Sequence, residues 1–120
     1  MQPRTAKLLH DCLTAATRIE ALIGDKTFED YAADEVFRLA LERLFEIAGE
    51  SLNQAVQRDE SIRTMIPEAG EVIGMRNRII HGYDTIDDES IWETAVFQVP
   101  TLREGLQATL DRYPPEEIIP

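Results

Sequence analysis

The sequence has a single cysteine, no long apolar run and about half as many basic as acidic side chains. With only Cys12 available, an internal disulfide is excluded. No apolar stretch approaches the roughly 18 residues that a membrane-spanning helix requires. The N-terminal residues lack the basic start and apolar stretch of a secretory signal. We therefore expect a soluble cytoplasmic protein that folds without covalent cross-links.

The scarcity of positive charge limits which partners the chain can bind. Its 12 lysine and arginine residues are outnumbered by 23 aspartate and glutamate residues, which gives a formal net charge of −11. Broad, nonspecific binding to nucleic acid depends on many cationic contacts to phosphate. The composition argues against such binding, so any nucleic acid must be handled at a local site.

Length and periodicity predict one all-helical domain. A chain of 120 residues can bury a single core without the help of disulfides or metal ions. Apolar residues recur at helical spacing in four segments, and no segment alternates as a strand would. We assign residues 1–113 to the domain and 114–120 to an extended C-terminal tail. The expected helices cover about residues 5–23, 30–56, 67–81 and 88–112.

The width of the apolar faces favours an antiparallel bundle of four to five helices. In the second segment, Phe37, Leu41 and Phe45 widen the apolar arc enough for contact with more than one neighbour. Pro100 should kink or split the fourth helix. The apolar surface exceeds what one four-helix bundle buries, and a homodimer would account for the surplus.

One octapeptide at the end of the third expected helix does not fit a purely structural pattern. On a helical wheel Arg76 falls at the centre of an apolar stripe. A guanidinium stays charged, and leaving it buried and unpaired would cost several kcal/mol. Arg76 must therefore meet a carboxylate, a phosphate or water in a cleft. The octapeptide reads Arg76-Asn77-Arg78-Ile79-Ile80-His81-Gly82-Tyr83, and the stripe consists of Val72, Ile73, Met75, Ile79 and Ile80.

The polar side chains of this octapeptide suit chemistry on a phosphodiester. His81 can take a proton from a ribose 2′-hydroxyl or give one to a leaving 5′-oxygen. Arg76 can hold a phosphate oxygen as charge builds up. No metal is required. In a straight helix the two side chains lie about 140° apart, so convergence needs either unwinding at residues 81–82 or a second protomer.

Structural explanations remain open for each of these residues. Arg76 can pair with Glu46 or Glu50 in a salt bridge, which would also orient it. His81 can simply cap its helix, where a cation is favoured, and Tyr83 can pack over the end of the bundle. Glutamates 42, 46 and 50 have the spacing of part of a carboxylate metal site, but the accompanying Glu-x-x-His pairs are absent.

The pattern Arg76-x4-His81-x-Tyr83 resembles the Arg-x4-His-x-Tyr motif of HepT-like ribonuclease toxins in the HEPN superfamily. Residues 40–50, in the second expected helix, resemble the corresponding helix of that family. The resemblance implies an all-helical homodimer that acts as a metal-independent endoribonuclease, with catalytic roles for Arg76, His81 and Asn77. It also implies a type VII toxin–antitoxin pair, in which a nucleotidyltransferase antitoxin silences the toxin by transferring AMP to Tyr83. A phosphate-binding role for Arg78 is our inference from its charge alone.

Two functions of different classes follow. In the first, the chain is an RNA-cleaving toxin with catalytic Arg76 and His81 and a regulatory Tyr83. In the second, it is a noncatalytic HEPN-like nucleotide-binding or scaffold module that partners a nucleotidyltransferase. The intact arginine, histidine and tyrosine favour the first.

Overall fold

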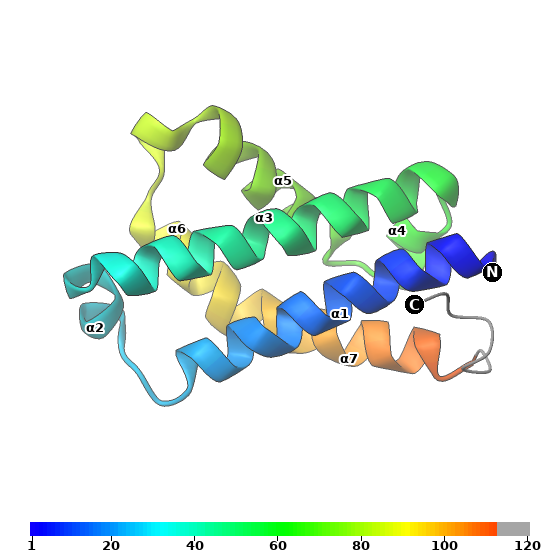
Figure 1. Ribbon diagram of the computed structural model, residues 1–120, viewed down its shortest axis with the longest axis horizontal. Coiled ribbons are helices and arrows are strands. Elements are labelled where there is room, and N and C mark those ends of the chain that lie inside the picture. The colour runs from blue at the N-terminus through cyan, green and yellow to red at the C-terminus, as the bar shows by residue number, and fades with distance from the viewer. Residues whose placement is uncertain (113–120) are drawn as a thin grey trace.

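A computed structural model describes residues 1–112 of the chain, apart from the side chain of Tyr83. In this range every regular element is helical, and successive long helices run antiparallel (Figure 1). This confirms the predicted all-helical bundle. The helices are α1 (Pro3–Ile23), α2 (Phe28–Ala33), α3 (Glu35–Arg58), α4 (Ile62–Met65), α5 (Ala69–His81), α6 (Asp88–Glu93) and α7 (Val99–Leu110), with a 3₁₀ turn η1 (Tyr83–Thr85) and a π-helix η2 (Thr94–Gln98).

The predicted helix over residues 30–56 is wrong at its start, because the chain breaks at Asp34. Asp34 has an extended backbone, and its carboxylate accepts a hydrogen bond from the Phe37 N–H at 3.1 Å. It therefore caps α3. The preceding turn forms the separate helix α2, which begins with a capping box between Thr27 and Asp30. The third predicted helix also starts later than expected, at Ala69.

The core lies between α3 and its neighbours. The helix α3 packs against α1 on one side and α5 on another, and α7 packs on α1. Phe37, Leu41 and Phe45 are buried, which confirms the wide apolar arc of α3. Two other apolar residues of this helix, Val36 and Leu39, are 77% and 57% exposed. They lie on the half of α3 away from these buried residues, so within residues 1–112 the apolar face of the helix is wider than its buried face.

The helix α2 closes one end of the bundle with a cluster of aromatic rings. Tyr31 is fully buried, with its ring centroid 5.2 Å from that of Phe37 and 5.5 Å from that of Trp92. Glu42 lies near this end, and desolvation raises its pKa. Repulsion from Asp88 adds to the effect. The end of the bundle therefore holds a carboxylate whose charge is unfavourable.

The predicted break at Pro100 is confirmed, and it takes the form of a π-helix. Asp87 starts α6, as expected, by accepting a hydrogen bond from the Glu89 N–H at 3.0 Å. Five residues, Thr94–Gln98, then form η2, in which the Val99 N–H reaches back to the Thr94 carbonyl. Proline offers no N–H to the preceding turn, so the wider π turn accommodates it before α7 begins.

Among residues 1–112 no helix is both long enough and apolar enough to cross a membrane. The predicted extended tail, 114–120, lies outside the described residues. Its boundary with the domain stays a prediction.

Candidate active site

The motif arginine lies at a close approach between α5 and α3. A Cβ atom added at Gly49 of α3 would lie 2.3 Å from the Cβ of Arg76 and 3.1 Å from the carbonyl oxygen of Val72. Real Cβ atoms almost never approach closer than 3.0 Å. Gly49 therefore lets the two backbones come together and lets the arginine side chain cross over α3. Sequence reasoning did not assign this role to Gly49, although a glycine inside a long helix is a signal of close packing.

The guanidinium of Arg76 is held by two side chains. Its Nη2 lies 2.7 Å from Oε2 of Glu50, and its Nη1 donates a hydrogen bond to Oδ1 of Asn77 at 2.9 Å. The other carboxylate oxygen of Glu50 accepts a hydrogen bond from Gln54 at 2.9 Å. Of the two carboxylates considered from the sequence, Glu50 is the partner, whereas Glu46 pairs with Arg43 at 3.0 Å. The expected meeting of Arg76 with a carboxylate is confirmed.

This arrangement leaves the guanidinium with unused donors. Arg76 is only 22% exposed, and its Nε has no hydrogen-bond partner within residues 1–112. A guanidinium carries five N–H bonds, of which Glu50 and Asn77 engage two. The remaining donors on Nη1 and Nη2 can bind the oxygens of a phosphate without breaking the contacts that orient the group.

The second motif residue, His81, does not meet Arg76 within one chain. It is the last residue of α5, is exposed, and remains in regular α-helix. Unwinding begins only at Gly82, so the 140° separation expected from the helical wheel persists. Of the two routes to convergence, unwinding of one chain is not taken in this structure. Ile80, expected in the apolar stripe, is 40% exposed beside His81.

Gly82 directly follows α5, at a position where a side chain would be crowded. Its N–H donates a hydrogen bond to the carbonyl of Arg78 at 2.8 Å. An added Cβ would lie 3.1 Å from the Thr85 hydroxyl and 3.2 Å from that carbonyl, and its φ of −124° is open to any residue. Tyr83 follows at the start of η1. Its side chain lies outside the described structure, so both roles expected of it, packing over the end of the bundle and accepting AMP, stay predictions.

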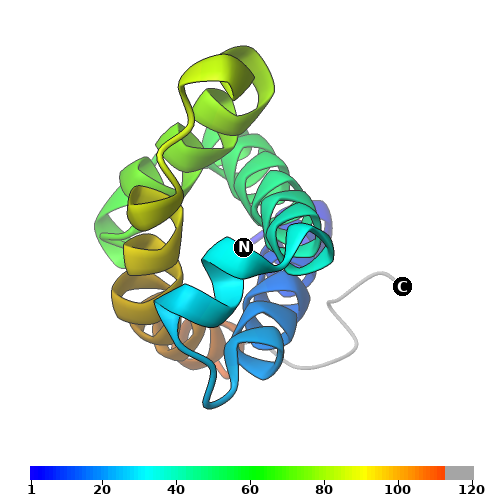
Figure 2. The same ribbon diagram turned by 90° about the vertical axis from the view of Figure 1, so that its left-hand side faces the viewer.

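Arg78 lies on the other flank of α5. It is more than half exposed, with Nη2 4.0 Å from Oε1 of Glu71. It lines a hollow that α5 shares with Ser90 of α6 and Phe97 of η2. Figure 2 shows α3 and the segment of α6 and η2 on opposite sides of the bundle below α5. Arg76 and Arg78 thus face different neighbours, and the role of Arg78 in binding phosphate stays a prediction.

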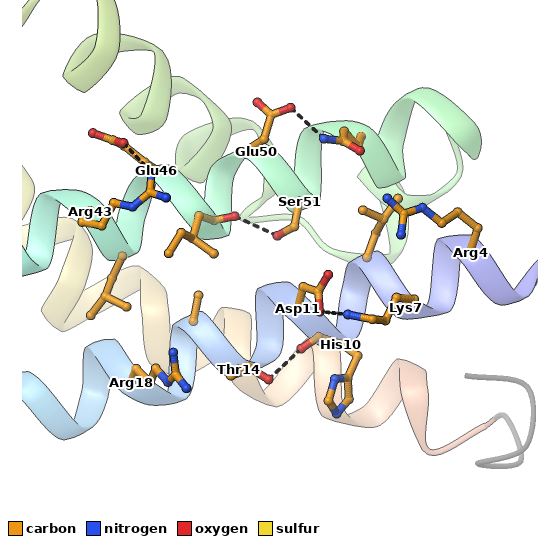
Figure 3. A pocket seen from close by; sticks show the side chains of 15 residues that line it. Arg4, Lys7, His10, Asp11, Thr14, Arg18, Arg43, Glu46, Glu50 and Ser51 are labelled. Atoms are coloured by element: carbon orange, nitrogen blue, oxygen red, sulfur yellow. Dashed lines mark hydrogen bonds and ion pairs between the residues drawn. The ribbon is translucent and has the colours of Figure 1, made fainter. Parts of the chain in front are cut away.

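A groove of about 830 Å³ lies between α1 and α3. Figure 3 shows basic side chains on its α1 side and Arg43, Glu46 and Glu50 on its α3 side. Its floor is apolar. Glu50 belongs both to this groove and to the ion pair with Arg76, so the groove adjoins the motif arginine. We call it the α1–α3 groove; its α1 side carries Arg4, Lys7, His10 and Arg18, and its floor includes Leu8, Ala15, Leu44 and Ile47.

Nothing in the sequence analysis predicted this groove. His10 was expected on the surface of the first helix, and it is exposed. Glutamates 42, 46 and 50 do not form a metal site: within residues 1–112 no three side chains of metal-binding type converge.

The fold and the motif together define the class of protein. A bundle of antiparallel helices in which the motif Arg76-x4-His81-x-Tyr83 closes α5 and begins η1 is the arrangement expected of a HEPN domain. The comparison with protein families gives the particular family. The model of the family described as "Ribonuclease HepT-like" matches residues 12–109, so the chain belongs to the HepT-like ribonuclease family.

Individual relatives agree with this assignment. The chain is 27% identical over 111 residues to a protein of Caldanaerobacter subterraneus subsp. tengcongensis named "Putative RNase", a match covering 92% of this chain and 95% of that protein. It is 30% identical over 95 residues to "Probable ribonuclease HepT" of Thermococcus cleftensis, covering 79% of this chain and 86% of the relative. No solved structure matches the chain significantly.

Proposed function

We propose that this protein is a metal-independent endoribonuclease that acts in the cytoplasm as the toxin of a type VII toxin–antitoxin pair. Family membership supports the ribonuclease class. The observation that carries the proposal is the state of Arg76: a guanidinium fixed by Glu50 and Asn77, with donors left over, at the start of a motif that also supplies an exposed imidazole. A preorganised cation of this kind suits the charge that builds up during phosphodiester cleavage.

The proposed reaction uses the ribose 2′-hydroxyl as the nucleophile. His81 removes its proton, the oxygen attacks the adjacent phosphorus, and the 5′-oxygen of the next nucleotide leaves with a proton from an acid. Arg76 donates hydrogen bonds to a nonbridging oxygen, while Asn77 and Glu50 keep the guanidinium in place. The products carry a 2′,3′-cyclic phosphate and a 5′-hydroxyl. A second copy of His81, from another protomer, can supply the acid.

Assembly of the site therefore requires a homodimer. Val36 and Leu39 lie exposed on α3, and the same helix lines the α1–α3 groove with Leu44 and Ile47. This apolar strip is flanked by ion-paired side chains, Lys7 with Asp11 on α1 and Arg43 with Glu46 on α3. A two-fold interface brings one patch against its own copy, so the exposed apolar side chains of the two copies cover each other. We assign the dimer interface to this face, which ends beside Arg76 at Glu50.

Light scattering tests this assembly. Leu39→Lys places a charge in the assigned interface and should give a monomer with little RNA cleavage. Ala108→Lys adds the same charge at an exposed position of α7 and should leave both the dimer and RNA cleavage intact. A wild-type monomer at micromolar concentration that still cleaves RNA would remove the shared-site scheme.

Cleavage itself is tested with single-stranded RNA in the presence of EDTA. Wild type should yield 2′,3′-cyclic phosphate and 5′-hydroxyl ends, and His81→Ala should lose about 10²-fold or more of the rate while keeping its helical content. Equal cleavage by both proteins would point to a contaminating nuclease and would leave the reaction without support.

A noncatalytic scaffold remains the second candidate, and one observation favours it. The Arg76–Glu50 ion pair, braced by Gln54, is also what a purely structural contact between α3 and α5 would contain. A scaffold would bind the same nucleotidyltransferase without cleaving RNA. The cleavage assay distinguishes the two functions, because only the toxin would cleave RNA at a rate that depends on His81.

We assign the silencing of the toxin to AMP transfer onto Tyr83. AMP attached to this phenol would bring bulk and at least one negative charge next to the motif, where it would compete with substrate phosphate. Incubation with the cognate nucleotidyltransferase and ATP should add AMP to the peptide that contains Tyr83, as seen by mass spectrometry. A label on a different peptide would favour inhibition by simple complex formation.

A further inference from the structure

A small hollow on the flank of α5 opposite Arg76 has an aromatic ring at its edge. It measures about 230 Å³ and lies between α5, α6 and η2. Phe97 of η2 lines it and is 70% exposed, although its neighbours Ala95 and Val99 are buried. The remaining lining is polar, from Glu71, Arg78, Ser90, Glu93, Thr94 and Gln98. A ring left in water among polar groups contributes little to the core.

The backbone beneath Phe97 is itself unusual. The ring is carried by the π-helix Thr94–Gln98, in which the Val99 N–H bonds to the Thr94 carbonyl five residues back. Such wide turns are rare and occur often at functional sites. Here the π turn presents Phe97 to solvent while Thr94 and Ala95 stay in the core.

We propose that this hollow is a subsite for one unpaired RNA base, which stacks on Phe97 while its phosphate contacts Arg78. The inference rests on the proposed ribonuclease function and adds a specificity-determining position to it. Aromatic rings bind single-stranded bases by stacking, and arginines bind the adjoining backbone. The hollow is smaller than the pockets that hold drug-sized ligands, which suits a single planar group.

Charge inside the hollow favours some bases over others. Glu71 is engaged with Arg78 at 4.0 Å, whereas Glu93 lines the hollow without a hydrogen bond or ion pair in the part of the chain that the structure describes. A carboxylate accepts hydrogen bonds from the exocyclic amino groups of bases. Glu93 therefore favours adenine, guanine or cytosine over uracil, which has no exocyclic amino group and offers only its ring N3–H.

The position of Arg78 connects this subsite to the motif. Arg78 precedes His81 by three residues, so both project from the outer face of α5, about 60° apart. An RNA strand that crosses this face passes His81, then reaches Arg78 and finally Phe97. With a helix diameter of about 10 Å, the stacked base lies within a few nucleotides of the bond that is cut.

The test measures binding without turnover. Fluorescence anisotropy with short 2′-O-methyl oligoadenylate and oligouridylate, which lack the nucleophile, reports affinity directly. Phe97→Ala and Phe97→Leu should each weaken oligoadenylate binding about 5- to 150-fold, the effect of losing one stacked base. Phe97→Trp should restore it, because tryptophan keeps the π face that leucine lacks.

Two further variants test the polar contacts. Arg78→Ala should weaken the binding of both oligonucleotides. It should also lower the salt dependence of binding by an amount equivalent to about one phosphate contact. The matched change at Arg58, exposed at the end of α3, should have little effect. Glu93→Gln should reduce the preference for adenylate over uridylate more than it changes overall affinity.

The outcomes separate the two proposals. Wild type that cleaves RNA while Phe97→Leu binds and cleaves equally well would overturn the subsite and leave the ribonuclease standing. Binding that depends on Phe97, with no cleavage by wild type, would support the subsite and overturn the ribonuclease. A Phe97→Ala variant that binds RNA normally but is a poor substrate for the nucleotidyltransferase would assign the ring to a protein interface and defeat the subsite.

Discussion

The close contact between Gly49 and Arg76 makes a quantitative prediction about a single methyl group. In Gly49→Ala the new Cβ would start 2.3 Å from the Cβ of Arg76, whereas ordinary contact begins at 3.4 Å. The helices α3 and α5 must therefore separate by about 1.1 Å at this point. Inserting a methyl group into a packed contact costs about 1–3 kcal/mol, and removing a helical glycine returns about 1 kcal/mol.

The expected net loss of stability is thus small, about 0–2 kcal/mol, equivalent to a fall in Tm of up to about 8 °C for a domain of this size. The effect on cleavage should be much larger. A displacement of about 1 Å can cost about 10²-fold in rate, because the guanidinium of Arg76 moves away from Glu50 and from the substrate phosphate. Circular dichroism and initial cleavage rates measure the two effects separately.

Gly70 provides the matched control. It also lies in a helix, α5, but a Cβ there would meet nothing within 4 Å. Gly70→Ala should therefore raise stability by up to about 1 kcal/mol and leave cleavage unchanged. Glu50→Gln, which keeps the shape of the side chain but removes its charge, should reduce cleavage without steric strain. The reasoning fails if Gly49→Ala behaves like Gly70→Ala in both assays.

Four other substitutions or reactions test separate parts of the structure. Arg76→Lys should retain less than a tenth of the cleavage rate, because one ammonium cannot hold Glu50 and a phosphate with the geometry of a guanidinium; wild-type activity would contradict this. Burial raises the folded-state pKa of Glu42, so its ionisation lowers stability as pH rises through that pKa. Glu42→Gln should raise Tm near pH 7 but not below about pH 4, where the glutamate is protonated in both states. Burial raises the pKa of Cys12 to about 12, so thiol reagents should modify it only as denaturant unfolds the chain. Tyr83→Phe should still cleave RNA and should accept no AMP; equal silencing of this variant would contradict the assignment.

Helix spacing predicted the bundle because apolar periodicity records which face of each helix is buried. The face of α3 with Phe37, Leu41 and Phe45 followed directly from this rule. Periodicity cannot say whether a neighbour is present, so it did not show that Val36 and Leu39, which are apolar, stay exposed. The break at Asp34 was also missed, because a single capping side chain ends one helix and starts the next without interrupting the apolar pattern.

The site was predictable in its residues but not in its contacts. A charged Arg76 inside an apolar stripe required a carboxylate, a phosphate or water as its partner, and the carboxylates considered were Glu46 and Glu50. Choosing between them needed the approach of α5 to α3 at Gly49, which is a fact of tertiary packing. The exposure of Phe97 likewise depends on the π turn, whose wider hydrogen bond has no simple sequence signal beyond the proline that follows.

The angle between Arg76 and His81 on α5 has a consequence for how the protein behaves as its amount changes. In the proposed dimer the reacting groups of a single chain do not converge on one site, so a newly made chain would not cleave RNA until it finds a second one. Below the dissociation constant of the dimer, cleavage rises with the square of protein concentration. In this proposal a cell that makes a little of the protein would tolerate it, and a modest rise in synthesis, or in survival of the chain, would produce a disproportionate rise in RNA cleavage.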